Sequence, residues 1–294
     1  MVVATGFFDG VHRGHRVVLE DLKRYAEHAN EKSAVVSFWP HPRTVLQQDV
    51  KYFRLLNTIE EKKELIKSIG IDEFHTIPFT KEFSRLTTEE FVKRYLKEEF
   101  GATTLVLGYD HRLGSNESQT QEDIVKICAS NGIKTVMGKE FTFMNKAVSS
   151  TIIRRTLERG DIAEATNLLG YNYPMTGVVV VGNMLGRKMG FPTANMQLYD
   201  PLKLVPRDGV YAVWAYVNQK RYMGVTNIGL RPTVTDGIIR TIETHILDFN
   251  EDIYGLPFTI EFVEAIRNER KFSNVDELIY QVGKDKYCAR KILR

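Results

Sequence analysis

The start of the chain places a glycine-rich turn between an apolar run and a helical pattern. Residues 2–5 are apolar or small, the turn Gly6-Phe7-Phe8-Asp9-Gly10-Val11-His12-Arg13-Gly14-His15 follows, and residues 17–29 carry apolar side chains at helical spacing. This order predicts a buried strand, a tight turn and a helix. Glycine lets the backbone approach a ligand closely, and a helix N-terminus presents free N–H groups and a partial positive charge. The stretch therefore predicts a phosphate-binding site.

Two histidines, His12 and His15, flank Gly14 at the end of this turn. One histidine alone in a turn is more often a simple surface residue. The pattern His-x-Gly-His between a strand and a helix favours a functional role instead. It resembles the signature of the nucleotidyltransferase superfamily, whose histidines hold the phosphates of ATP while its α-phosphate is attacked.

Length and charge bound what the chain can be. Its 294 residues suit two domains, because single cores usually stop growing near about 250 residues. The net charge of +3 is too small to argue for nucleic acid but is compatible with anionic small substrates. No apolar run approaches the ~20 residues that span a bilayer, and the N-terminus lacks a signal-peptide pattern. With only Cys128 and Cys288 present, we expect a cytoplasmic protein without disulfides and without a membrane or nucleic-acid partner.

The first half alternates short apolar runs with helical patterns. Strands are expected at residues 2–5, 34–39, 74–77, 104–107 and 134–137. Capping-box spacing at Thr58/Glu61 and Thr87/Glu90, a cap at Thr120 and a last helix from Asp161 to Gly170 mark the helices between and after them. This alternation predicts an α/β domain, with a parallel sheet covered on both faces and ligands bound beyond the carboxyl ends of its strands.

Two loops follow later strands of this sheet. In Phe38-Trp39-Pro40-His41-Pro42 the prolines fix an extended loop that would line a cleft, although a rigid connection is the alternative. In Leu107-Gly108-Tyr109-Asp110-His111-Arg112, Asp110 could accept hydrogen bonds from a ribose or a base, although acidic loop residues are more often simply solvated.

A third segment, Val148-Ser149-Ser150-Thr151-Ile152-Ile153-Arg154, opens another helical pattern. Hydroxyl side chains at a helix start cap free N–H groups, which is their commoner use. The same atoms can hold phosphate oxygens, and Arg154, one turn later, can add a guanidinium group. Both interpretations stay open on the residues alone.

The pattern changes after Pro174. Strand-like runs at residues 178–181, 210–217, 221–226, 238–247 and 258–266 have no helical pattern between them, and Asn218-Gln219 suits a tight hairpin turn. Asn274 and Glu277 cap a final helix, with Leu278, Ile279, Val282 and Cys288 on its expected inner face. We expect a small antiparallel barrel closed by a C-terminal helix, with domains at residues 1–170 and 171–294.

One loop of this second half combines glycines with cations. Its sequence is Gly182-Asn183-Met184-Leu185-Gly186-Arg187-Lys188-Met189-Gly190-Phe191-Pro192-Thr193-Ala194-Asn195. Such a loop can close over phosphates, although glycine-rich loops between strands are usually only turns, and the spacing is not that of a P-loop. On an extended segment Thr193 and Asn195 face the same way, and their oxygens could ligate Mg²⁺.

Two further groups complete the candidates. Glu243 lies within a strand-like run, and a carboxylate on a rigid strand suits the base that phosphorylation of an alcohol needs; a solvated strand glutamate is the alternative. Residues 267–272 (Arg-Asn-Glu-Arg-Lys-Phe) would otherwise be a charged surface loop.

Together these elements resemble the bifunctional bacterial riboflavin kinase/FAD synthetase family over nearly the whole chain. The matching elements are residues 6–15, 38–42, 108–110 and 149–154 in the first half and residues 182–195, 208–212, 227–233, 243–245 and 252–255 in the second. One departure is Leu113, which stands where the family commonly has phenylalanine.

For the second half the resemblance implies phosphorylation of riboflavin by ATP to give FMN. Glu243 would be the base, Thr193 and Asn195 would hold Mg²⁺ and phosphate, and the loop with Gly182, Gly186, Arg187 and Gly190 would cover the nucleotide. The flavin would be held by Arg267, Glu269 and Phe272.

For the first half the resemblance implies that the FMN phosphate attacks the α-phosphate of a second ATP, giving FAD and pyrophosphate. This nucleophile is already anionic, so no base and no covalent intermediate are expected. Catalysis would come from His12, His15, Ser150, Thr151, Arg154 and Mg²⁺. ATP would also contact Gly6, Phe7, Phe8, Asp9, Gly14 and Asp110, and flavin would contact Pro40, His41 and Pro42.

Two rival functions remain at this point. One is an enzyme with a single activity, in which the other half only binds flavin. The other is a flavin- or nucleotide-binding regulator without turnover. The presence of a base and paired phosphate-binding groups favours the bifunctional enzyme, with riboflavin, FMN and ATP as its small-molecule substrates. The oligomeric state is left open.

Overall fold

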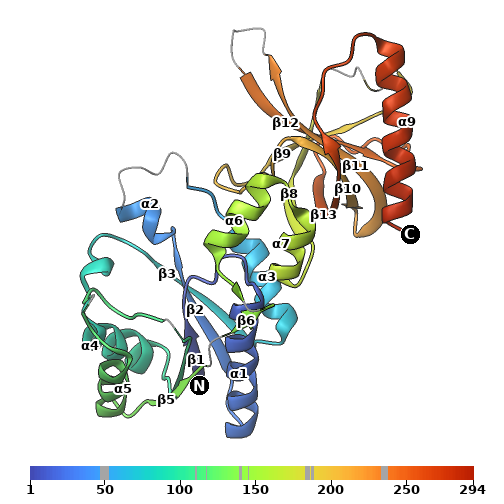
Figure 1. Cartoon of the computed structure of the whole chain (residues 1–294). Coiled ribbons are helices and arrows are strands. Elements are labelled where there is room, and N and C mark those ends of the chain that lie inside the picture. Colours follow the sequence, from blue (N-terminus) through green and yellow to red (C-terminus); the bar gives the residue numbers. More distant parts are fainter. Residues whose placement is uncertain are drawn as a thin grey trace. The chain divides into compact units, whose positions relative to one another are not determined.

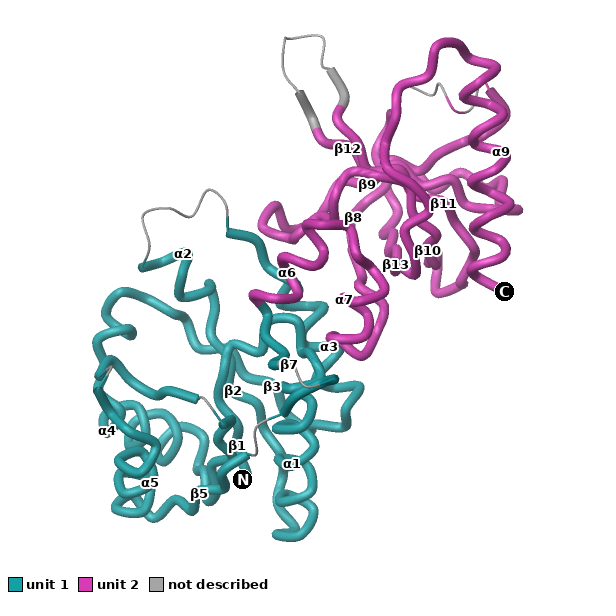
Figure 2. The backbone as a smooth tube through the Cα atoms, viewed as in Figure 1, with its two compact units in different colours: residues 1–150 teal, residues 151–294 magenta. Residues whose placement is uncertain are grey.

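The computed structural model of the chain has two compact units, residues 1–150 and 151–294 (Figure 2). It describes residues 1–46, 53–109, 111–116, 118–138, 141–144, 146–182, 186, 189–232 and 238–294. The helix α7 (Ile162–Leu169) packs against barrel strands of the second unit, and α6 (Ser150–Arg159), apart from its first residue, groups with them. The domain boundary expected after Gly170 stays a prediction.

The first unit is built on a five-stranded parallel sheet (Figure 1). Its strands are β1 (Val2–Thr5), β2 (Ser33–Trp39), β3 (Glu73–Pro78), β4 (Thr104–Leu107) and β5 (Lys134–Met137), in the spatial order β3-β2-β1-β4-β5. All five predicted strands are present, and the parallel α/β architecture is confirmed. The strand order reverses direction between β1 and β4, so the crevice at their carboxyl ends is the place where such sheets bind ligands.

Helices cover both faces of this sheet. They are α1 (Arg13–Ala29), α2 (Pro42–Leu46), α3 (Ile59–Ile69), α4 (Thr88–Phe91) continued by the π-helix η3 (Val92–Glu99), and α5 (Gln121–Ser130), with a short 3₁₀ turn η2 (Phe83–Arg85) and a small hairpin of β6 (Thr142–Phe143) and β7 (Lys146–Ala147). Because side chains alternate along a strand, Val2 and Ala4 pack with residues of α1 and α3, whereas Val3 packs with residues of α4, η3 and α5.

The helices begin where their predicted caps lie. The Thr58 hydroxyl accepts from the backbone N–H of Glu61, and the Glu61 carboxylate accepts from the backbone N–H of Thr58. The same reciprocal pair occurs at Thr87/Glu90, and at Thr120 the partner is Asp123. These boxes satisfy free N–H groups at each helix start, and in α3 the residues Lys62 and Ile66 lie on the buried side.

The second unit is a closed antiparallel barrel of six strands in the order β10-β11-β12-β9-β8-β13, so the predicted barrel is confirmed. The strands are β8 (Tyr173–Val180), β9 (Ala194–Leu198), β10 (Gly209–Val217), β11 (Lys220–Pro232), β12 (Ile238–Ile246) and β13 (Pro257–Asn268). The sequence indicated five strands and left β9 as part of an extended segment. The hairpin between β10 and β11 turns at Asn218 and Gln219, both with positive φ, as predicted.

Aromatic residues fill the barrel core. Tyr173, Tyr211 and Phe262 are buried, with ring centroids 6.4 Å apart for Tyr173–Phe262 and 5.2 Å for Tyr211–Phe262. The Tyr173 hydroxyl donates to the Leu204 carbonyl at 2.8 Å, which satisfies its buried polar atom. The helix α9 (Val275–Ile292) covers β10, β11 and β13 from outside, as the C-terminal helix was expected to do (Figure 1).

A buried ion pair joins α9 to the barrel. Asp285, only 2% exposed, accepts from Nε of Arg267 on β13 at 3.1 Å and from its Nη2 at 2.8 Å. Gln281 donates to the same carboxylate at 2.7 Å. The family resemblance implies that Arg267 binds flavin, and that role stays a prediction; in this structure its guanidinium group pairs with Asp285 of the C-terminal helix.

Removal of this carboxylate should destabilise the second unit. We expect Asp285→Ala to lower its free energy of unfolding by roughly 2–3 kcal/mol, less than a fully buried pair would lose, because the Arg267 side chain keeps 20% exposure. The two tryptophans, Trp39 and Trp214, lie one in each unit, so urea unfolding of a Trp39→Phe protein can be followed through Trp214 alone. Asp276→Ala, an exposed carboxylate on the same helix, is the control and should cost less than about 1 kcal/mol. Equal unfolding midpoints for both variants would contradict the assignment.

Candidate active sites

The turn after β1 has an unusual backbone. Phe8 and Val11 have φ angles of 48° and 33°, in the left-handed region that non-glycine residues rarely adopt, and Gly10 lies there too at 86°. For a β-branched residue such as Val11 this conformation is a true outlier. Strain of this kind persists where the surrounding structure imposes it, and it is concentrated at ligand-binding sites. The turn is therefore a candidate site on geometry as well as on sequence.

The two histidines of the turn lie together at the start of α1. His12 caps the helix, and its Nδ1 accepts from the backbone N–H of His15 at 3.3 Å. A neutral His12 consequently carries its proton on Nε2. The two rings stack, with centroids 3.6 Å apart and planes 17° apart. The pattern His-x-Gly-His thus places two imidazoles side by side at a helix N-terminus.

The His15 ring is held neutral. Burial lowers its pKa well below the usual range, and the nearby His12 and Lys62 lower it further. Its Nδ1 is buried and has no hydrogen-bond partner within the part of the chain that the structure describes. A neutral imidazole offers one donor and one acceptor, so an incoming phosphate can use the donor without an imidazolium being formed first.

Asp9 and Ser150, both expected to contact ATP, fix the turn from within. The buried Asp9 carboxylate accepts from the backbone N–H groups of Leu56 at 3.1 Å and Asn57 at 3.2 Å. The Ser150 hydroxyl donates to the Asp9 carbonyl at 2.8 Å. These bonds anchor the turn to the segment before α3 and to the first residue of α6. Contacts of either residue with ATP stay predictions.

Two other predicted loops lie beside this turn. The ring of Phe7 is 3.9 Å from the His41 ring, centroid to centroid, so the loop with Pro40 and Pro42 adjoins the glycine turn; the Trp39–Pro40 bond is cis. The Thr5 hydroxyl and His111 Nε2 are 3.0 Å apart, which joins the carboxyl ends of β1 and β4. Asp110 lies outside the described residues, and Thr151 and Arg154 follow Ser150 on α6, where their expected ATP contacts stay predictions.

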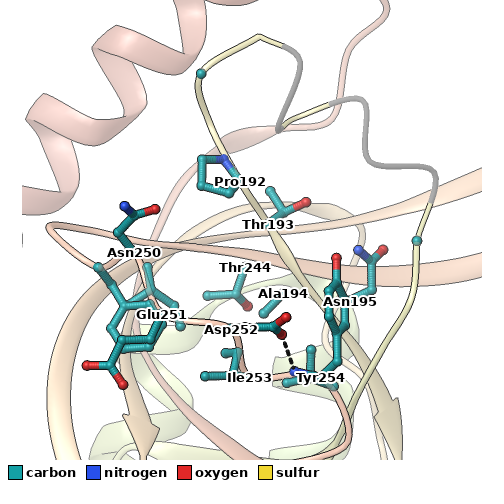
Figure 3. Close-up of a pocket in the computed structure, with 15 residues that line it drawn as sticks. Pro192, Thr193, Ala194, Asn195, Thr244, Asn250, Glu251, Asp252, Ile253 and Tyr254 are labelled. Carbon is teal, nitrogen blue, oxygen red and sulfur yellow. Dashed lines mark hydrogen bonds between the residues drawn. The ribbon is translucent and has the colours of Figure 1, made fainter.

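The barrel has its own cavity of about 340 Å³ (Figure 3). Four predicted residues line it: Gly182, Gly190, Thr193 and Asn195. Gly186 does not, and Arg187 lies outside the described residues. The sequence singled out none of the other polar lining residues as site residues, namely Thr244 on β12 and Asn250, Glu251, Asp252 and Tyr254 in the loop before β13. The available signal was the family resemblance of residues 243–245 and 252–255, together with the adjacent polar residues Asn250 and Glu251.

Oxygen ligands of three kinds face this cavity. Thr193 offers a hydroxyl, Asn195 an amide oxygen and Asp252 a carboxylate, which also accepts from the backbone N–H of Tyr254 at 3.1 Å (Figure 3). A Cβ on Gly182 would lie 2.3 Å from the Asn195 side chain, so only glycine allows this loop to pass so close. The donor set fits a hard cation such as Mg²⁺ together with substrate phosphates. In the described parts of the chain, no cluster of three His, Cys, Asp or Glu residues could hold a metal ion by itself.

Glu243 lies next to this cavity but does not line it. In the barrel register it is opposite Asn195 of β9 and Asn227 of β11, and directly opposite residues share one face of a sheet. The predicted base and the predicted metal ligand Asn195 therefore lie on the same face. The role of Glu243 stays a prediction.

The expected flavin loop of the barrel is partly engaged within the protein. Glu269 packs over Gly229, where a Cβ would lie 2.0 Å from its carboxylate, and burial with the nearby Asp208 raises the Glu269 pKa. The Arg267 and Arg270 guanidinium groups lie 5.6 and 4.8 Å from the Phe272 ring centroid. Arg267, Arg270 and Phe272 thus form one cation–aromatic cluster at the end of β13.

Comparisons with known proteins agree for both halves. A model of the FAD synthetase family matches residues 1–152, and a model of the riboflavin kinase family matches residues 169–293. The bifunctional riboflavin kinase/FMN adenylyltransferase of Listeria monocytogenes is 37% identical over 98% of this chain and 91% of its own length; the Escherichia coli K12 protein of the same name is 34% identical over 99% and 92%. A crystal structure from Streptococcus pneumoniae, described as a macrolide-efflux protein, superposes with a TM-score of 0.88 and 32% identity, covering 98% of this chain and 93% of that one.

The fold and the two sites therefore define a transferase with a nucleotidyltransferase domain and a kinase barrel in tandem. More particularly, the chain belongs to the bifunctional riboflavin kinase/FMN adenylyltransferase family. Among the helices that the structure describes, none is both long and apolar enough to cross a membrane.

Proposed function

We propose that this chain makes FAD from riboflavin in two ATP-dependent steps, one in each unit. The observation that carries the proposal is the tandem arrangement itself. The half that matches the FAD synthetase family has a parallel sheet with paired histidines in the turn after β1. The half that matches the riboflavin kinase family has a barrel with a cavity lined by oxygen atoms. FMN, the product of the barrel, is the substrate of the other unit.

In the barrel, the terminal ribityl hydroxyl of riboflavin would attack the γ-phosphate of ATP. The new O–P bond replaces the bond to the β-phosphate oxygen, ADP leaves, and Glu243 takes the hydroxyl proton. Thr193 and Asn195 would hold Mg²⁺, which supplies charge neutralisation on the ATP phosphates. The loop with Gly182 and Gly190 would close over the nucleotide.

In the first unit, a phosphate oxygen of FMN would attack the α-phosphate of ATP and displace pyrophosphate. No proton has to be removed, so the task of the protein is to align the reactants and to stabilise charge on the α-phosphate. His12 and His15 would donate hydrogen bonds there, and Ser150, Thr151 and Arg154 would hold the leaving phosphates. We also propose a cytoplasmic location, where ATP is the available nucleotide.

A chromatographic product assay tests the proposal. Riboflavin, ATP and Mg²⁺ should give FMN followed by FAD, and FMN in place of riboflavin should give FAD. FMN alone would leave a kinase beside an idle first unit. FAD from supplied FMN only would leave an adenylyltransferase, and no product in either mixture would favour a flavin-binding regulator.

The Mg²⁺ dependence of the first step tests the ligand set. Thr193→Val keeps the side-chain shape but removes the hydroxyl, so half-maximal FMN formation should need roughly tenfold more Mg²⁺, the equivalent of about 1.4 kcal/mol. Thr259→Val is the matched control, because its hydroxyl pairs with Thr176 at 3.2 Å and does not line the cavity. An unchanged Mg²⁺ titration in Thr193→Val would show that its hydroxyl is not a ligand.

A further inference from the structure

One lysine of the first unit is completely buried. Lys62 lies in the first turn of α3 and has an exposed fraction of 0%. It occupies the apolar side of this helix, one turn before Ile66, which packs in the core under the sheet. Its Nζ has no hydrogen-bond partner within the described ranges. A buried ammonium without such partners is costly, and a methionine or leucine would be the ordinary residue at this position.

The ammonium group of Lys62 lies directly against the turn after β1 (residues 6–15). Its Nζ is 3.8 Å from the centroid of the Phe7 ring, in the geometry of a cation–π contact. Another neighbour of Phe7 is His41 of the loop expected to hold flavin, at 3.9 Å between ring centroids. Lys62 therefore contacts an aromatic side chain that joins the turn after β1 to the loop after β2.

The charge of Lys62 depends on its surroundings. Burial lowers the Lys62 pKa to about 8 and the nearby Asp9 carboxylate opposes this shift, so the ammonium form still dominates at neutral pH. On α1, His15 is among the groups affected, because the Lys62 cation helps to lower the His15 pKa. Asp9 also accepts hydrogen bonds from the backbone just before α3. The turn is therefore joined to the α3 segment both by these hydrogen bonds and by the contact of Lys62 with Phe7.

We propose that Lys62 is a positioning residue of the adenylyl-transfer site: its ammonium group fixes Phe7 in the turn after β1 and places a positive charge next to the turn that carries His15. The inference rests on the proposed function of the first unit. Such a charge, already in place and shielded from water, favours the negative charge that builds up on the ATP phosphates during transfer. Its effect passes through Phe7 and His15, because the Lys62 side chain is fully buried.

The test is Lys62→Met in the full-length chain, which keeps the length of the side chain and removes the charge. FAD formation from FMN should fall at least tenfold in kcat, while FMN formation from riboflavin in the same molecule should stay within twofold. The first unit should not lose stability, since an apolar side chain replaces a buried ammonium group whose desolvation is costly. Thermal unfolding followed through Trp39 in a Trp214→Phe background reports on this unit alone.

Two readouts separate a charge effect from a packing effect. In an NMR pH titration, the His15 signal, assigned with His15→Asn, should move to a higher pKa in Lys62→Met. In the pH profile of kcat/KM for FAD formation, the wild type should decline as the pH rises through about 8, where Lys62 loses its proton, and Lys62→Met should lack this step. The control is Lys63→Met, the exposed neighbour on α3, which should change none of these quantities.

The inference is overturned if Lys62→Met forms FAD at the wild-type rate. It is overturned equally if the variant loses activity only together with stability, with the His15 titration unmoved. A wild-type chain that makes no FAD from FMN would instead reject the proposed function. The His15 titration needs no substrate and would still decide whether the Lys62 charge acts on this ring.

Discussion

Glu243→Gln should abolish FMN formation and leave the conversion of supplied FMN to FAD intact. Glutamine has the shape of glutamate but cannot accept the ribityl proton, so the loss should be about 10²–10⁴-fold in kcat, the usual contribution of a general base. Binding of riboflavin should change little, because β12 keeps its register with Asn195 and Asn227. Initial rates of FMN and FAD formation, measured separately by chromatography, give the comparison.

A matched control for this change is Glu264→Gln on β13, an exposed strand glutamate whose loss should leave both rates unaltered. If Glu243→Gln removed both activities in a protein that stays folded, the assignment of two separate sites would be wrong. A loss confined to the apparent KM for riboflavin would make Glu243 a substrate-binding residue and leave the base unidentified.

The second large effect concerns the first unit. His15→Ala should reduce FAD formation from FMN by about 10²–10³-fold, the range typical of one lost donor at a site of developing charge, and should leave FMN formation unchanged. The helix start is preserved in this variant, because His12 Nδ1 accepts from the backbone N–H of residue 15 and not from its ring. The loss should therefore appear in kcat and not in the stability of the unit.

His28→Ala, at the exposed far end of α1, is the appropriate comparison. Its FAD-forming rate should equal that of the wild type. Equal activities of His15→Ala and the wild type would remove His15 from the catalytic group and leave the pattern His-x-Gly-His with a purely structural role.

Local features of the fold were predictable from the sequence. Thr58 and Glu61 are three residues apart and bond to each other, so the start of α3 can be read without tertiary information. The same is true of the turn at Asn218-Gln219 and of the five strands of the parallel sheet. The turn with His12 and His15 was likewise recognisable, because its glycines and histidines are contiguous.

The remaining features depend on contacts between distant residues. The partners of the Asp9 carboxylate lie 47 and 48 positions further along the chain. Nothing in the sequence of residues 55–57 predicts that the N–H groups of residues 56 and 57 donate hydrogen bonds to it. In the sequence, Lys62 stands within a charged stretch, where a lysine is usually exposed. Only the packing of α3 shows that this lysine is buried. Strand β9 was missed because it directly continues the glycine-rich loop. Its pairing with β8 and β12, and not a local sequence signal, defines it as a strand.

The order of strands in the barrel has a consequence for its synthesis on the ribosome. The last strand, β13, pairs with both β8 and β10, so the barrel stays open until residue 268 has left the exit tunnel. Until then two strands expose unpaired edges, which are sites of mispairing between chains. The parallel sheet of the first unit ends at Met137 and needs no later residue for its pairing. A nascent chain can thus carry a paired adenylyltransferase sheet while its kinase barrel is still open.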